Sequence, residues 1–154
     1  MRKQRSQLNL AQLRTIPATC MGMHIRRASR IVTQIYDEAL RPTGLVLNQF
    51  TLLVAIHLAG STSQARLAQE LFTDQTTLTR NLKLLEKRRL IEMQPGEDRR
   101  VRLVSLTPEG QVALANALPL WEQAQAEVIE RFGQEQSKAL LSLLAEAPIL
   151  VNKA

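Results

Sequence analysis

The sequence predicts a mainly α fold with one small β-hairpin, and two observations carry this prediction. Along most of the 154 residues, apolar side chains recur at three- and four-residue steps, which is typical of amphipathic helices. The exception is LIEMQPGEDRRVRLVSL, residues 90–106, which is rich in β-branched residues and alternates on both sides of Pro95-Gly96. Aromatic residues make up only 3% of the chain, so aliphatic side chains must fill the core.

Four helices are expected before the hairpin, at about residues 18–40, 47–59, 61–71 and 74–88. The turn Arg41–Gly44 ends the first helix, because proline cannot continue the hydrogen-bond ladder and glycine tolerates the turn. The second helix ends near Gly60, and His57 is expected on its packed side as a core histidine. A run of hydroxyl residues at 61–63 offers N-cap oxygens to the third helix, and Asp74 is the expected N-cap of the fourth.

The hairpin strands are expected at Leu90–Met93 and Arg100–Leu106. Thr107 is the expected N-cap of the next helix, and Pro108 suits its first position, where no N–H donor is needed. The region from 108 to about 147 is predicted to form two helices that break near Gly133, the first of them kinked at Pro119.

Three short helices followed by a two-stranded hairpin predict a winged helix-turn-helix, with residues 61–71 and 74–88 as the helix-turn-helix pair. The expected division of the chain has three parts. Residues 1–45 form a basic arm and a long helix, residues 46–106 the winged helix-turn-helix, and residues 107–154 the C-terminal helices.

The helix expected at 74–88 has two faces. Leu78, Leu82 and Leu85 have the spacing of a packed stripe. The second helix of a helix-turn-helix lies in the DNA major groove, where hydroxyls can contact phosphates or a thymine methyl and Gln and Arg can make paired base contacts. The residues of this kind on the other face are Gln75, Thr76, Thr79, Arg80 and Lys83. A solvated polar face is the alternative interpretation of the same pattern.

The turn of the hairpin, PGEDRRVR, is a second candidate DNA-binding segment, through Asp98, Arg99, Arg100 and Arg102. An arginine on a thin β-ribbon suits the narrow minor groove, where negative potential is focused. A carboxylate two residues before it can hold the guanidinium in one orientation. The alternative is again a solvated charged loop.

The net charge of +6 and the pI near 10.2 indicate a polyanionic partner, although charge alone does not choose between DNA, RNA and a membrane surface. Residues 1–30 hold seven Arg or Lys and no acid, whereas residues 107–154 carry a net charge of −3. No apolar run approaches the ~18 residues that a membrane span needs, and no signal peptide is expected. A single cysteine fits a reducing cytoplasm.

Two other classes of protein were weighed against a DNA-binding one. The chain has no HExxH, GxSxG or P-loop motif and only two histidines, so neither an enzyme nor a cofactor or metal site is expected. A winged-helix protein-interaction module without specific DNA binding is the closer rival. It would tolerate an acidic recognition face, whereas Arg80, Lys83 and the arginines of the hairpin favour DNA.

Four segments together give a specific resemblance. GLVLNQFTLLVAI, TSQARLAQEL, DQTTLTRNLKLLEKRRLIE and DRRVRLVSLTPEG resemble, in order and at the right spacing, the signature segments of the MarR family of transcriptional regulators. The resemblance covers roughly residues 20–135. It implies a mainly α winged-helix fold and a homodimer that binds pseudo-palindromic DNA. It also implies that the winged part of the chain, at 46–106, binds DNA and that the terminal helices, at 1–45 and 107–154, are dimerisation helices. Most members of the family are repressors that a small molecule or oxidation releases.

The resemblance also implies roles for single residues. Arg100 would enter the minor groove with Asp98 steadying it, and Ser63 and Gln64 would begin the helix that contacts the DNA backbone. Thr76, Thr77, Thr79 and Arg80 match the recognition-helix segment of the family. The chain departs from the family at Val46, where a threonine that caps the helix is usual, and at Arg89, where glycine is usual.

The terminal segments contain more aliphatic residues than a winged helix-turn-helix can bury. In the family these segments intertwine, which implies a dimer interface with the candidates Leu114, Leu118, Trp121, Val128, Leu140, Leu141 and Leu144. Packing within one chain is the alternative. A small-molecule effector is expected between the dimerisation and DNA-binding parts, of phenolic or carboxylate type as in related proteins, although no residue selects one.

Cys20 is a possible redox residue, because peroxide-sensing relatives carry a reactive cysteine in this helix. Their cysteine aligns with Gly22, and two residues rotate a helix by about 200°, so Cys20 faces another way. An inert helical cysteine is therefore the main expectation. Cys20 and His24 share a helix face, but two ligands are too few for zinc.

Overall fold

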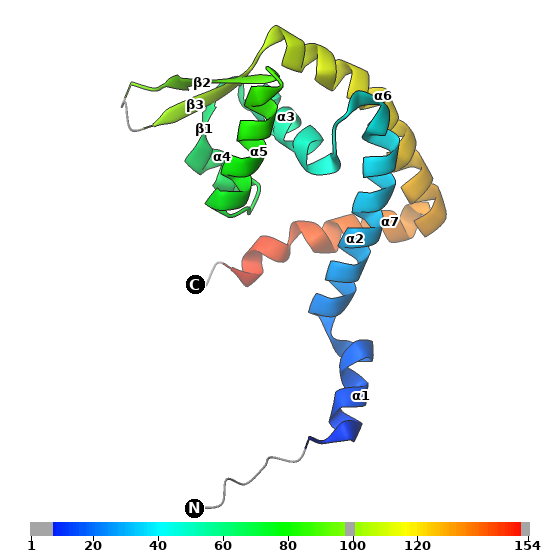
Figure 1. Cartoon of the computed structure of the whole chain (residues 1–154). Coiled ribbons are helices and arrows are strands. Elements are labelled where there is room, and N and C mark those ends of the chain that lie inside the picture. The colour runs from blue at the N-terminus through cyan, green and yellow to red at the C-terminus, as the bar shows by residue number, and fades with distance from the viewer. Residues whose placement is uncertain (1–7, 98–100, 152–154) are drawn as a thin grey trace, which may run out of the picture. The chain divides into compact units, whose positions relative to one another are not determined.

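The computed structural model describes residues 8–97 and 101–151, and it is mainly helical with one small antiparallel sheet (Figure 1). The α-helices are α1 Leu10–Thr19, α2 Met21–Leu40, α3 Leu47–Ala59, α4 Gln64–Glu70, α5 Gln75–Lys87, α6 Pro108–Phe132 and α7 Gln134–Ala145. Two 3₁₀ segments, η1 Arg41–Thr43 and η2 Ala147–Leu150, follow α2 and α7. The strands are β1 Thr62–Ser63, β2 Ile91–Pro95 and β3 Arg102–Leu106. The predicted fold class, mainly α with a hairpin wing, is confirmed.

The described chain divides into two compact units that meet between Gln34 and Ile35, within α2. The helix predicted at about 18–40 is confirmed as α2, which begins at Met21, whereas α1 was not predicted. Cys20 is a correction, because it lies in extended backbone between α1 and α2 and not inside a helix. The side chain of Asn9 caps α1 by accepting from the N–H groups of Ala11 and Gln12. No residue of α1 is buried. Because the helix has no buried apolar face, its sequence lacks the apolar periodicity that predicts a helix.

The second unit has one hydrophobic core, built from α3, α4, α5, α6 and the sheet. Leu53, Ile56, Leu67 and Val104 are fully buried at its centre. The predicted stripe of α5 is confirmed, because Leu78, Leu82 and Leu85 are all buried in this core. The faces of α5 that do not carry these leucines are therefore available to solvent or to a partner.

The sheet has three strands in the order β1-β3-β2, so the predicted two-stranded hairpin is present but incomplete. β1 precedes α4 and pairs with β3 through Thr62 opposite Val104 and Ser63 opposite Leu103. Two residues are too few to show an alternating pattern, which is why the sequence did not reveal this strand. The hairpin strands begin one or two residues later than predicted, at Ile91 and Arg102. β1 ties the start of the helix-turn-helix to the wing.

The predicted helix starts are confirmed by their caps. Ser63, Asp74 and Thr107 each accept a hydrogen bond from a backbone N–H of the helix that follows. α3 is different, since Val46 at its N-cap position makes no side-chain hydrogen bond. Pro108 occupies the first turn of α6, as expected.

His57 is a correction to the sequence analysis. The predicted core histidine is exposed, although α3 buries Phe50, Leu53 and Ile56 on the side that faces the core. His57 follows Ile56 by one residue and is rotated about 100° from it, which carries the imidazole beyond the edge of the packed face.

α6 runs without interruption through Pro119 and ends at Gly133, where α7 begins, so the predicted break is confirmed. Figure 1 shows α6 curved along its length, with Pro119 inside the helix. No single helix among the described residues is long and apolar enough to cross a membrane, although the bent pair Met21–Thr43 and Leu47–Ala59 passes that test jointly, by length and composition only.

Candidate nucleic-acid interface

α5 presents a polar surface opposite its buried leucines. One shallow hollow of about 460 Å³ is lined by Gln75, Thr76, Thr79, Arg80 and Lys83. Thr79 is half-buried and the other four are exposed. The five residues chosen from the sequence for base or phosphate contact thus lie together on one surface, which we call the reading face.

The reading face is positively charged. Arg80 and Lys83 form no ion pair with the described residues, whereas the guanidinium of Arg66 on α4 is held by Glu70 at 2.8 Å. A cation without a nearby carboxylate keeps its full attraction for an external anion. The reading face is therefore suited to phosphate oxygens or to the acceptor atoms of bases.

Asp74 fixes the start of α5. Its Oδ1 accepts a hydrogen bond from the backbone N–H of Thr77 at 2.9 Å. Hydrogen bonds from the Thr77 side chain and backbone hold the pKa of the Asp74 carboxyl below its ordinary value. The Thr77 side chain lies away from the reading face, in a second hollow with Asn48, Thr51 and Asn81. Thr77 is thus the one recognition-helix candidate that the structure separates from the rest.

Ser63 and Gln64 are already engaged within the domain. Ser63 Oγ accepts from the N–H of Arg66 at 3.2 Å, and Gln64 Nε2 lies 3.2 Å from Met93 Sδ on β2. Both residues are half-buried. Their side chains hold α4 in place, which leaves little of them free to contact DNA.

The wing is a β-ribbon formed by β2 and β3 (Figure 1). Arg102 is exposed on β3 and pairs in register with Pro95. The N–H of Gly96 donates to the carbonyl of Val101 at 2.8 Å, which begins to close the turn. The wing candidates Asp98, Arg99 and Arg100 lie outside the described residues.

Two basic residues after α5 have roles that the sequence did not reveal. Arg88 Nη1 and Nη2 donate to the carbonyl oxygens of Gly44 at 2.8 Å and Thr43 at 3.3 Å. Arg89 has a φ of +58°, the left-handed backbone region that glycine adopts without strain. The family that the chain resembles usually has glycine at position 89, which is consistent with this backbone conformation. No pattern in the sequence distinguished Arg88 from the basic residues beside it.

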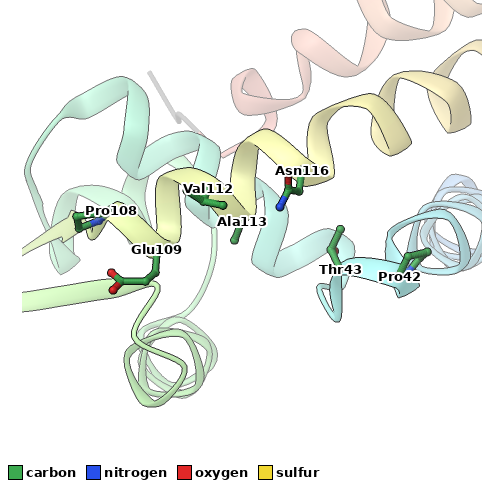
Figure 2. A pocket seen from close by; sticks show the side chains of 7 residues that line it. All are labelled: Pro42, Thr43, Pro108, Glu109, Val112, Ala113 and Asn116. Atoms are coloured by element: carbon green, nitrogen blue, oxygen red, sulfur yellow. The ribbon is translucent and has the colours of Figure 1, made fainter.

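A further hollow, of about 580 Å³, lies between η1 and the start of α6 (Figure 2). Figure 2 shows Pro42 and Thr43 on the η1 side and Val112, Ala113 and Asn116 on α6. Pro108 and Glu109 complete the lining, and the carboxylate of Glu109 points away from the other lining side chains. The surface is mostly apolar with a few polar groups, which is the composition of small-molecule sites.

The predicted dimer residues fall into three groups. Leu114 and Trp121 pack on the core of their own chain, and the Trp121 ring stacks on Phe50 with centroids 6.0 Å apart. Val128 is half-buried. Leu118, Leu140, Leu141 and Leu144 are 40–57% exposed. The exposed group leaves the most apolar surface for a second chain, while Leu114, Trp121 and Val128 keep part of their surface exposed as well.

Cys20 is a free, half-buried cysteine between α1 and α2. The backbone N–H of His24 donates to the carbonyl of Cys20 at 3.2 Å, which continues the helix start and involves neither side chain. Within residues 8–97 and 101–151, no three His, Cys, Asp or Glu side chains are grouped closely enough to hold a metal ion.

Comparison with known proteins identifies the fold and the family. Residues 43–100 match the sequence profile of the MarR family. The transcriptional regulator MosR of M. tuberculosis, solved in complex with DNA, is 39% identical over 83% of this chain and 97% of its own, with a TM-score of 0.71. The transcriptional repressor CouR, solved on a 23-mer DNA duplex, is 26% identical over 93% and 99% of the two chains, with a TM-score of 0.79. An uncharacterized HTH-type transcriptional regulator of Bacillus subtilis, YwoH, is 27% identical over 77% of this chain and 87% of its own. The chain therefore belongs to the MarR family of winged helix-turn-helix transcriptional regulators.

Proposed function

We propose that the protein is a homodimeric, cytoplasmic repressor that binds a pseudo-palindromic operator and leaves it when a small molecule binds. The observation that carries the DNA-binding part is the reading face, where Gln75, Thr76, Thr79, Arg80 and Lys83 surround one exposed hollow on α5. The solved relatives MosR and CouR are bound to DNA, which supports DNA binding by this chain.

In the proposed complex α5 lies in the major groove. Gln75 and Arg80 have the geometry for paired hydrogen bonds to a base edge, while Thr76 and Thr79 are short enough to let the backbone approach. Lys83, two turns further along, reaches a phosphate as a point charge. Two α5 helices of a symmetric dimer would then read half-sites about 34 Å apart.

The wing completes the proposed complex. The described part of the ribbon carries the exposed Arg102 on β3, and the sequence between β2 and β3 contains Asp98, Arg99 and Arg100. We propose that Arg100 enters the flanking minor groove and that Asp98 orients it. An Arg100→Ala variant should bind DNA far more weakly while it remains a folded dimer by circular dichroism and gel filtration.

The partner of the exposed leucines is proposed to be a second copy of the chain. Leu118, Leu140, Leu141 and Leu144 leave much of their apolar surface in water in the isolated chain. Each such side chain gains about 1–2 kcal/mol when fully buried, so an interface that covers them is strongly favoured. The variant Leu141→Glu, at the most exposed of the four, should shift the protein toward monomer in analytical ultracentrifugation.

The hollow between η1 and α6 is the proposed effector site. Its apolar wall, Pro42, Val112 and Ala113, suits a flat aromatic body, and Asn116 supplies a hydrogen-bonding amide. Glu109 also borders the hollow, but Figure 2 shows its carboxylate pointing away from the other lining side chains. The lining therefore does not choose between the phenolic and carboxylate ligands expected from related proteins.

Fluorescence anisotropy tests DNA binding directly. The DNA upstream of the protein's own gene is compared with a scrambled duplex of equal length, over a series of salt concentrations. We expect tighter binding to the upstream DNA, and log K that falls steeply as log salt rises, because many phosphates are contacted.

Charge-matched variants separate base reading from general electrostatics. Arg80→Gln should weaken specific binding by about 1–3 kcal/mol, whereas Arg131→Gln, which removes one charge on α6, should change it little. Equal effects of the two variants, or equal binding of both duplexes, would instead favour the protein-interaction module. Peroxide treatment of the wild type and of Cys20→Ser tests the redox alternative: release that disappears in Cys20→Ser would establish it.

A further inference from the structure

The guanidinium of Arg88 connects the end of α5 to a turn more than forty residues earlier. Arg88 is the C-cap residue of α5, and its Nη1 and Nη2 donate to the carbonyls of Gly44 and Thr43 at 2.8 and 3.3 Å. The neighbouring Lys87 and Arg89 side chains make no hydrogen bond or ion pair with the described residues. Arg88 is thus distinguished within the basic run by its contacts.

The two carbonyls belong to a turn that is held in one conformation. Thr43 Oγ1 donates to the carbonyl of Leu40 at 2.7 Å and accepts from the N–H of Leu45 at 3.2 Å. Gly44 has a φ of +68°, and a Cβ built there would lie 3.3 Å from Arg88 Nη2. The left-handed backbone of the turn favours glycine, and a Cβ at this position would also press on the Arg88 guanidinium and shift it by a few tenths of an ångström.

The same turn forms one wall of the hollow in Figure 2. Pro42 and Thr43 line it from η1, opposite Asn116 of α6. The carbonyl of Thr43 thus faces Arg88 while the residue itself borders the hollow. A ligand that displaces η1 must also displace two acceptors that hold the end of α5.

We propose that Arg88 is a positioning residue, which fixes the recognition helix against the α2–α3 turn. Occupation of the hollow lowers DNA affinity by moving the carbonyls of Thr43 and Gly44 away from this guanidinium. The coupling rests on the proposed DNA-binding function, whereas the fixing of α5 by Arg88 is a property of the free protein and is tested separately.

The first test needs no DNA. Arg88→Lys keeps the positive charge but cannot serve both carbonyls with a rigid fork. Amide hydrogen exchange should become about two- to tenfold faster at residues 88–90, whose N–H groups close the last turn of α5, with little change in Tm. Arg89→Lys is the matched control and should exchange as the wild type does. Unchanged exchange in Arg88→Lys would overturn the proposal.

The second test fills the hollow without a ligand. Asn116→Trp places an indole beside Thr43, and Ala115→Trp puts the same group on a neighbouring position that does not line the hollow. Asn116→Trp should raise the Kd for upstream DNA about tenfold, and Ala115→Trp should not. In the double variant with Arg88→Lys, filling the hollow should have little further effect, because the link is already broken. Additive effects would refute the coupling.

Two further outcomes distinguish the positioning role of Arg88 from a phosphate contact and from a failure of the proposed function. If Arg88 instead contacts a phosphate, Arg88→Lys binds normally while Arg88→Gln weakens specific and scrambled DNA alike and reduces the salt slope by about one. That result would overturn the positioning role. If the wild type shows no preference for upstream DNA, the proposed function fails, and the hydrogen-exchange comparison still decides whether Arg88 fixes α5.

Discussion

The carboxylate of Asp37 accepts a hydrogen bond from the backbone N–H of Leu47 at 2.6 Å, so a residue of α2 caps the start of α3. Val46, which holds the N-cap position of α3, has an extended backbone and no side-chain acceptor. The missing hydroxyl at position 46 is thus compensated by the side chain of Asp37, nine residues earlier. The bond lies within the second unit, where it connects the last part of α2 to the start of α3.

Removal of this bond should destabilise the protein. Asp37→Ala should lower the free energy of unfolding by about 1–2 kcal/mol, because it leaves the N–H of Leu47 without a charged acceptor. Val46→Thr supplies a local cap and should recover part of the loss in the double variant. Urea unfolding at fixed protein concentration measures both. A double variant as unstable as Asp37→Ala would show that the Asp37 bond does not act as a cap.

Arg89→Gly should stabilise the protein. Arg89 is exposed, and its φ of +58° costs a residue with a Cβ about 1 kcal/mol relative to glycine. Glu86→Gly, at an exposed position within α5, should do the opposite by about 1 kcal/mol, since glycine weakens a helix interior. Thermal unfolding shows whether each variant raises or lowers the Tm relative to the wild type. A fall in Tm for Arg89→Gly would mean that the arginine side chain contributes a contact larger than the backbone strain.

Gly110→Ala should be strongly destabilising. A Cβ at Gly110 would lie 1.9 Å from the carbonyl oxygen of Leu90, so α6 must move away from the start of the hairpin. Overpacking against backbone costs about 1–3 kcal/mol or more. Gly22→Ala is the control, because no atom lies within 4 Å of a Cβ there and alanine favours the helix. A Gly110→Ala variant as stable as Gly22→Ala would place the start of α6 elsewhere.

The cap of α5 should weaken in acid. Hydrogen bonds from Thr77 lower the pKa of Asp74 below its ordinary 3.8 in the folded state. A lowered folded pKa stabilises the folded state above pH 3.8, and this contribution is lost as the pH falls through the folded pKa. Asn retains the acceptor oxygen at every pH, so the stability of the wild type relative to Asp74→Asn should fall as the pH is lowered below 3.8. A difference that does not vary with pH would exclude this titration.

The sequence was sufficient where a single segment carries its own signal. The stripe of Leu78, Leu82 and Leu85 predicted the packed face of α5, and the polar residues before and between these leucines predicted the reading face. Asp74 and Thr107 marked helix starts because capping depends on neighbours within three residues. Interactions between residues a few positions apart can be recognised directly in the sequence.

The sequence was insufficient where a contact joins distant segments. β1 exists only because β3 lies beside it, and His57 is exposed because the core ends at Ile56. Asp37 and Arg88 were read as ordinary charged residues, yet each satisfies backbone groups across the fold.

By itself, then, the sequence determined the order of the helices, the hairpin, the basic reading face and the family, because each follows from local periodicity, capping or short motifs. Only the tertiary structure decided which polar side chains hold the domain together and which remain free for DNA. That choice depends on distances between residues forty positions apart, and chain order does not specify those distances until the core has packed.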